Sequence, residues 1–263
     1  MTNPNLWNQL LVWPITNLLV VFYKFCEWLN IPGPLGFAII LLTVVVRFAL
    51  YPLMHAQLKS AKKMADMKPH LDVLSLKHKG DKQALQQAQL ALYKEHGVNP
   101  AAGCLPTLVQ FPILIALYNV FYQVLGNGNA TKMMEEINAI VYNPALQLKA
   151  LDVTFIGVNL GIKPSDWQKY GWWLLLVPLI TALLQLYQSK LMTPKSAPKL
   201  AITEGKEGEK KSDTMADMQK QMMFITPIMF GFFAFQLPIG LSLYWNIFGL
   251  FGIIQQIQVN KGK

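Results

Sequence analysis

The sequence carries few charged residues. Only 14% of its 263 residues are Asp, Glu, Lys or Arg, while 53% are hydrophobic, and soluble domains carry about 25% charged residues. The polar segments between the apolar stretches leave little room for the core of a soluble domain. The composition therefore excludes an ordinary soluble domain. It predicts an all-α integral membrane protein, because a helix satisfies its own backbone polar groups within lipid.

The sequence also lacks motifs for catalysis or cofactor binding. It contains no P-loop, Gly-rich nucleotide loop, HExxH or GxSxG motif, and no paired carboxylates within its apolar stretches. Its two cysteines, Cys26 and Cys104, have no metal-ligand spacing, and they fall on opposite sides of the membrane in the topology expected from the charges. These absences argue against an enzyme, and no metal or cofactor is expected.

Five apolar runs are long enough, or nearly so, to cross a membrane as helices. A spanning helix needs about 20 residues, because it rises 1.5 Å per residue through about 30 Å of hydrocarbon. The runs are 36–54, 104–125, 171–191, 222–237 and 241–259. The fourth run is the shortest, so it either borrows flanking residues or lies where the bilayer is thin. The sequence therefore predicts a bundle of five transmembrane helices.

Basic residues are distributed unevenly between these runs. The stretches 55–100 and 190–220 and the tail 260–263 hold 17 of the 23 Lys and Arg residues, whereas Lys24 and residues 126–170 contribute five. Because basic loops are retained in the cytoplasm, the N-terminus is predicted outside and the C-terminus inside, with 126–170 as an extracytoplasmic connection. The same lysines would attract anionic lipid or the RNA of a bound particle, but no specific nucleic-acid recognition is expected.

Residues 1–30 contain a separate apolar segment ahead of the first run, at 7–29. Pro14, Lys24 and Glu27 interrupt this segment, and it lacks the basic start of a signal peptide. Its three tryptophans suit a membrane–water interface. We therefore expect an amphipathic helix on the outer membrane surface, with a re-entrant or spanning helix as the alternative.

Residues 55–99 are predicted to form a cytoplasmic helical hairpin. Two polar helices, His55–Lys79 and Asp81–His96, are expected, with Gly80 ending the first and Asp81 capping the second. The apolar seam between them is thin and consists of Leu58, Met64, Met67, Leu71, Leu74, Leu85, Leu92 and Tyr93. Such a seam predicts a mobile hairpin, and its histidines are expected to be solvated rather than bound to metal.

Residues 192–221 form the second predicted cytoplasmic connection. The segment Thr193–Thr214 is rich in Pro, Gly, Lys and Glu, which predicts disorder because it cannot bury a core. A short polar helix, Met215–Gln221, is expected to lead from this segment into the fourth run. The last two runs are then joined by a turn at Leu237–Gly240.

Arg47 is the one charged residue inside the first apolar run. A guanidinium left in lipid costs about 2.5–3.5 kcal/mol on insertion scales, so such a side chain normally faces protein or water. All fourteen acidic residues lie outside the five runs, whereas a buried structural arginine would be expected to have a carboxylate partner. Arg47 is therefore predicted to lie in a hydrated groove, with its charge open to an arriving molecule.

Other polar and aromatic residues lie at a compatible depth in the runs. The candidates for the groove are Thr43, Gln110, Gln185, Tyr244, Trp245 and Asn246. Thr181 and Gln188 extend a stripe with Gln185 along the third run. Each polar residue could instead only hydrogen-bond to a neighbouring helix, for about 0.6 kcal/mol. The alternative function is a small anion transporter or channel that uses Arg47 as its binding charge.

Three segments together resemble the YidC, Oxa and Albino family of membrane protein insertases. They are GFAIILLTVVVRFALYPLMHAQLKSAKKM, ALYKEHGVNPAAGCLPTLVQFPILIALYNVFY and LPIGLSLYWNIFGLFGIIQQ. The resemblance implies a five-helix core around a groove that is open to the cytoplasm and the lipid and closed toward the outside. It also implies that Arg47 lies in this groove, and that Thr43, Gln110 and Trp245 line it or contact substrate.

The resemblance further implies what such a protein does and where it works. It implies an insertase or chaperone that moves nascent membrane proteins into the lipid bilayer without nucleotide hydrolysis. The ribosome, the signal recognition particle and the Sec translocon are the partners it implies. The expected location is a bacterial plasma membrane, in a short form without the large periplasmic domain. Cys26 follows FYKF, which is not a lipobox, so lipid modification there is not expected.

Overall fold

The computed structural model describes residues 2–78, 80–97, 111–120, 130–192 and 214–261. The main helices are α1 (Trp13–Trp28), α2 (Pro34–Ala49), α3 (Tyr51–Asp66), α4 (Lys68–Lys77), α5 (Lys82–Glu95), α7 (Ala130–Asn138), α8 (Trp167–Tyr170), α9 (Leu176–Met192), α10 (Thr214–Gln236) and α11 (Ile239–Lys261). A further apolar helix covers Phe111–Val120. A π-helical segment, η1 (Asn8–Val12), precedes α1, and the strands β1 (Thr154–Phe155) and β2 (Val158–Asn159) form a small hairpin.

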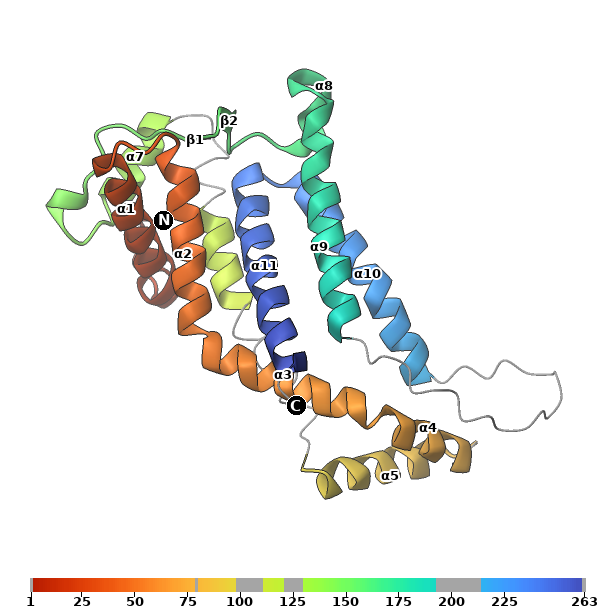
Figure 1. Cartoon of the computed structure of the whole chain (residues 1–263). Coiled ribbons are helices and arrows are strands. Elements are labelled where there is room, and N and C mark those ends of the chain that lie inside the picture. The colour runs from red at the N-terminus through yellow and green to blue at the C-terminus, as the bar shows by residue number, and fades with distance from the viewer. Residues whose placement is uncertain (1, 79, 98–110, 121–129, 193–213, 262–263) are drawn as a thin grey trace.

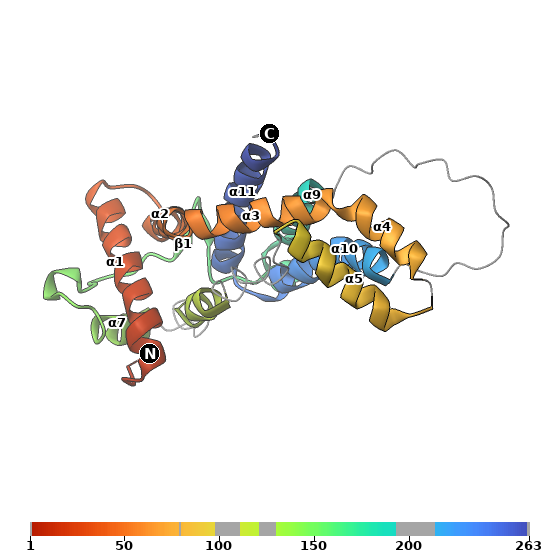
Figure 2. The ribbon, with the colours of Figure 1, turned by 90° about the horizontal axis from the view of Figure 1, so that it is seen from below.

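Helices α2, α9, α10 and α11 run lengthwise through the molecule (Figure 1). Helix α9 packs against α10 and α11, and α11 also packs against α2. Helix α1 packs against α2 but runs across it, since α1 is seen from the side in Figure 2, where α2 is seen end on. The buried apolar core lies between α1, α2, residues 111–120 and the first turns of α11.

Membrane-spanning potential is present in several of the described helices. By length and composition, Asn8–Trp28 and Trp172–Leu191 could each cross a bilayer, and the bent pair Pro34–Ala49 and Tyr51–Met64 could form a third span. Two shorter apolar helices are Phe111–Val120 and Met223–Gln236. The expected all-helical membrane architecture therefore agrees with the structure in outline, while the count of five spans remains a prediction.

The first predicted run, 36–54, was expected to be a single helix, but the structure divides it between two helices. Helix α2 ends at Ala49, and the chain bends by 64° before α3 begins at Tyr51. Pro52 lacks a backbone N–H and so cannot continue the hydrogen bonds of α2. Arg47 therefore lies in the last turn of α2, immediately before this bend.

Helices α9, α10 and α11 overlap the last three predicted runs. A 3₁₀ turn, η5 (Trp172–Leu175), leads into α9, and together they cover the third run. Helix α10 is continuous from Thr214, so the predicted polar helix and the fourth run are one helix. Residues 104–110 and 121–125 of the second run, and most of the predicted 192–221 connection, lie outside the described residues.

The predicted helical hairpin consists of three helices rather than two. The first expected helix is divided at Met67 into α3 and α4, with Pro69 in the first turn of α4. The Asp81 side chain caps α5 by accepting hydrogen bonds from the N–H groups of Gln83 and Ala84, both at 3.0 Å, which confirms the predicted cap. Helix α4 ends earlier than expected, at Lys77 with His78 as its C-cap, so Gly80, with a φ of 96°, lies in the turn before Asp81 and does not end the helix.

The seam of the hairpin is small. Met67 and Tyr93 are buried against each other, with Met64, Leu71 and Leu92 packed around them. Burial raises the pKa of the Tyr93 hydroxyl above its ordinary value. The hairpin is therefore held by a satellite cluster rather than by the main core.

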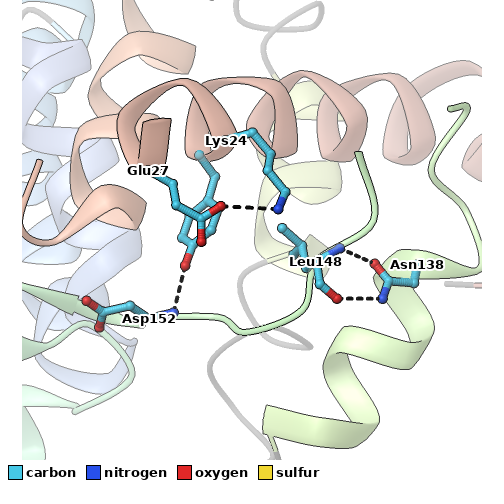
Figure 3. Close-up of polar contacts among 6 residues, drawn as sticks. Lys24, Glu27, Asn138, Leu148 and Asp152 are labelled. Carbon is cyan, nitrogen blue, oxygen red and sulfur yellow. Dashed lines mark hydrogen bonds and ion pairs between the residues drawn. The ribbon is translucent and has the colours of Figure 1, made fainter. Parts of the chain in front are cut away.

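The opposite end of the bundle is covered by residues 130–162, which we call the cap. Side chains of α1 exchange hydrogen bonds with the backbone of the cap. Asn17 donates to the carbonyl of Ile140 at 3.0 Å and accepts from the N–H of Tyr142 at 2.7 Å. The Tyr23 hydroxyl accepts from the N–H of Asp152 at 2.8 Å (Figure 3). These bonds attach the cap firmly to α1.

The cap also joins α2 and α11. The β-hairpin turns through Ile156 and Gly157, both with positive φ, and places Phe155 on the start of α2. The Phe155 side chain fills the space that a Cβ on Gly36 would take, with its nearest atom 2.0 Å from that position. Two N–H groups at the start of α11 donate at 2.9 Å to cap carbonyls, namely Ile239 to Ile162 and Gly240 to Leu160.

Candidate functional site

Arg47 is buried between α2 and α11. Its side chain is only 4% exposed. The guanidinium carbon lies 3.5 Å from the centroid of the Phe248 ring, in a cation–π contact. Nη2 donates a hydrogen bond to the backbone carbonyl of Phe248. One residue of α11 therefore contacts the guanidinium both with its ring and with its backbone.

The remaining donors of Arg47 are not satisfied by the described residues. Nε and Nη1 are buried and have no hydrogen-bond partner within the part of the chain that the structure describes. The one ion pair among those residues, Lys24 with Glu27 at 3.1 Å, lies on α1 and does not involve Arg47 (Figure 3). Buried unpaired N–H groups are costly, so this guanidinium is suited to a polar group supplied from outside the helices.

Gly252 on α11 allows the Arg47 side chain to lie close to the α11 backbone. A Cβ at Gly252 would lie 2.7 Å from Nη2 of Arg47 and 2.8 Å from Nε2 of Gln188, closer than real Cβ atoms come to such atoms. Gln188 comes from α9 and Arg47 from α2, so two polar side chains from different helices meet at one point of α11. The site is therefore formed where α2, α9 and α11 converge.

The predicted site residues are placed as follows. Thr43 is buried one turn before Arg47, and its hydroxyl donates to the Ile39 carbonyl at 2.7 Å, within its own helix. Gln185 is half-buried on α9, one turn before Gln188. Gln110 lies outside the described residues. The roles of these three residues in lining a groove remain predictions.

The three consecutive candidates on α11 face different neighbours. Tyr244 is fully buried, with its ring 5.7 Å from that of Phe248, on the Arg47 side. The Trp245 ring instead packs against α10, with ring-centroid distances of 5.4 Å to Phe230 and 6.4 Å to Phe233. Asn246 is half-buried, and its buried Oδ1 has no partner among the described residues. The structure therefore brings Tyr244, but not Trp245, toward Arg47.

Sequence reasoning did not select Phe248 and Gly252, and it named Gln188 only as part of a stripe. The available signal was the segment GLFG at 249–252, since glycines spaced along a membrane helix allow other groups to approach its backbone. The polarity of individual residues could not indicate which side chains use that approach. Every residue has a backbone carbonyl, so residue types could not indicate which carbonyl is the partner of Arg47.

Metal ligation finds no support in the described part of the chain. No group of three or more His, Cys, Asp or Glu side chains that could hold a metal ion occurs among those residues. Cys26 is a free, buried thiol on α1. The chemistry of the site is therefore that of a buried cation with amide and aromatic neighbours.

Comparisons with known proteins now identify the family. Residues 28–263 match the model of the family described as 60Kd inner membrane protein. The chain belongs to this family. The membrane protein insertase YidC of Wolinella succinogenes is 33% identical over 248 residues, which cover 94% of this chain and 36% of that protein. The YidC of Rickettsia conorii is 30% identical over 244 residues, covering 92% of this chain and 38% of that protein.

A solved structure supports the same assignment within the 60Kd inner membrane protein family. An active YidC insertase crystal structure with its first transmembrane domain resolved is 26% identical, with a TM-score of 0.52. The matched region covers 99% of this chain and 47% of the solved chain. The resemblance to the YidC, Oxa and Albino insertases is thus confirmed. The chain spans 36% and 38% of the two relatives named above.

Proposed function

We propose that this protein is a membrane protein insertase and chaperone. It takes a nascent membrane protein into a hydrated groove beside Arg47 and releases the apolar segment sideways into the bilayer, without nucleotide hydrolysis. The observation that carries the proposal is the buried Arg47 guanidinium. Two of its nitrogens, Nε and Nη1, have no partner among the described residues. Membership of a family whose relatives are named insertases supports the same function.

The proposed mechanism uses Arg47 as a transient partner for polar segments. A groove that reaches partway across the membrane shortens the apolar distance that a polar segment must cross. Acidic or polar side chains of the substrate then replace water at the guanidinium, where low local polarity strengthens the attraction. Because the contact is to mobile groups and not to a fixed carboxylate, the substrate can leave again.

Apolar faces of α9 and α11 would guide the hydrophobic segment outward. Large apolar side chains are exposed along these helices: Leu176, Leu179, Ile180, Leu183, Tyr187, Leu250 and Ile254. Transfer of the substrate's apolar surface into lipid would drive release, at about 25 cal/mol per Å². No nucleotide is needed for this step, because partition supplies the free energy.

The proposed topology places the cap outside and the helical hairpin in the cytoplasm of a bacterial plasma membrane. Helix α1 then lies in the outer interface, which its direction across α2 supports (Figure 2). The apolar residues Leu10 of η1 and Val21, Phe25 and Trp28 of α1 are exposed, as expected for a face turned toward lipid. The hairpin α4–α5 would recruit a ribosome, the signal recognition particle or the Sec translocon.

An anion transporter or channel is the second candidate, because a buried cation could also bind a small anion. Purified protein in liposomes separates the two functions. Insertion of a single-span test protein with an acidic translocated segment supports the insertase. Saturable anion flux without insertion supports the transporter and contradicts our proposal. Protein with Arg47→Ala serves as the matched control in both assays.

A further inference from the structure

We propose that Gly252 is a positioning residue for Arg47, an inference that rests on the proposed insertase function. The missing side chain at position 252 lets the guanidinium lie directly on α11. Nη2 of Arg47 is 2.7 Å, and Nε2 of Gln188 2.8 Å, from the position of a Cβ on Gly252. A methyl group there cannot coexist with both side chains where they are.

The atoms that a methyl group would meet are the ends of two long, flexible side chains. They are not backbone atoms, so α11 itself need not move to accept alanine. The guanidinium would instead leave its place over the Phe248 ring and lose its bond to the Phe248 carbonyl. Gly252→Ala is therefore expected to preserve the fold and displace the charge.

Gly249 provides a matched control on the same helix. The nearest atom to a Cβ at Gly249 is Oε1 of Gln188 at 3.9 Å, an ordinary van der Waals distance. Gly249→Ala and Gly252→Ala remove the same backbone freedom and give the same gain in helix propensity. Any difference between the two variants therefore reports the displaced side chains.

The position of the charge matters for one class of substrate. A guanidinium held over α11 keeps its positive charge at the point where α2, α9 and α11 converge, which favours translocated segments that carry carboxylates. A displaced guanidinium loses this alignment, whereas a substrate with a neutral translocated segment has no need of it. The inference thus assigns Gly252 to the handling of acidic segments.

The experiment compares Gly252→Ala with Gly249→Ala in liposomes, using test proteins with acidic or neutral translocated segments. We expect Gly252→Ala to lower insertion of the acidic substrate about tenfold and to change insertion of the neutral one less than about twofold. Gly249→Ala should insert both like the original protein. Equal insertion of the acidic substrate by the two glycine variants would overturn the positioning role.

Arg47→Lys supplies a readout that a general structural defect would not change. Lysine ends one bond earlier than the guanidinium nitrogens, so it has no atom at the Nη2 position. In the Arg47→Lys background, Gly252→Ala should cost less than about twofold, so the two changes are not additive. Additive losses would contradict the inference.

Loss of the fold in Gly252→Ala is also informative. If the contact with Arg47 causes that loss, the double variant with Arg47→Lys regains a folded protein, and failure to regain it overturns the inference. The proposed function is tested separately by the unmodified protein. If that protein inserts the acidic substrate and Gly252→Ala inserts it equally well, only the positioning role fails.

Discussion

The two ends of the helix bundle are held in different ways. At the cap, hydrogen bonds connect residues 130–162 with α1 and with the start of α11, and Phe155 packs directly on α2. At the other end, α4 and α5 meet through the small cluster around Met67 and Tyr93. Helix α3 is joined to α11 there by two hydrogen bonds, from Lys62 to the Val259 carbonyl and from Gln255 to the Tyr51 carbonyl.

The difference separates two tasks within one fold. Polar side chains such as Asn17, bonded in both directions to cap backbone, favour a single arrangement of the cap. A satellite cluster of a few apolar residues permits movement of α4 and α5, because little buried surface opposes it. This contrast supports a bundle that is closed at the cap and accessible at the helical hairpin.

Replacing residues 68–95 with a Gly/Ser linker is the strongest test of this contrast. The change removes α4 and α5 but keeps α3 and its bond from Lys62 to the Val259 carbonyl at 3.0 Å. We expect a folded, membrane-embedded protein whose insertion rate falls about tenfold or more, because recruitment is lost. Insertion of ribosome-bound nascent chains into liposomes and thermal unfolding in detergent measure the two effects.

Two outcomes of the hairpin replacement would change the account. Normal insertion would reject recruitment by α4 and α5. Unfolding of the bundle would show that these helices are a structural lid, and the two ends would then be equally necessary for the fold.

Asn17→Ala should have the largest effect on stability. The change leaves the buried Ile140 carbonyl and the partly buried Tyr142 N–H without the Asn17 side chain, at a cost of about 2–4 kcal/mol in the free energy of unfolding. Chemical denaturation in detergent measures this cost. Asn143→Ala is the control, because exposed Asn143 caps only a local turn through the N–H of Ala145. Similar losses for the two variants would contradict the central role of Asn17.

Lys62→Ala should have the smallest effect. The half-buried side chain donates to the Val259 carbonyl near the end of α11, and loss of such a hydrogen bond should cost about 1 kcal/mol in unfolding free energy. Lys62→Arg should restore most of that amount. A cost as large as that of Asn17→Ala would show that both ends are fixed with similar strength.

Much of the helix order could be predicted from the apolar runs. The runs at 171–191, 222–237 and 241–259 correspond to η5 with α9, to α10 and to α11. The position of Arg47 inside the first run, without an acidic residue in any run, identified it as the central candidate. Composition and periodicity are sufficient for these conclusions, because each depends on residue types within one segment.

The remaining features depend on contacts between distant segments. The strands β1 and β2 have two residues each, too few to show an alternating pattern. They are stabilised by the packing of Phe155, a residue of β1, against α2. Tyr244 and Trp245 were both expected at the site, but neighbouring residues on a helix point in different directions. The importance of Gly252 depends on the side chains of α2 and α9 that lie against it, and these could not be identified from the sequence of α11.

Insertion by Arg47→Ala and Arg47→Lys tests the central claim most directly. Both variants should unfold within about 2–4 °C of the original protein, because no described carboxylate depends on Arg47. Insertion of a substrate with an acidic translocated segment should fall about tenfold in the alanine variant and remain near the original level with lysine. An unstable alanine variant that inserts normally per folded molecule would contradict the account and make Arg47 a structural residue.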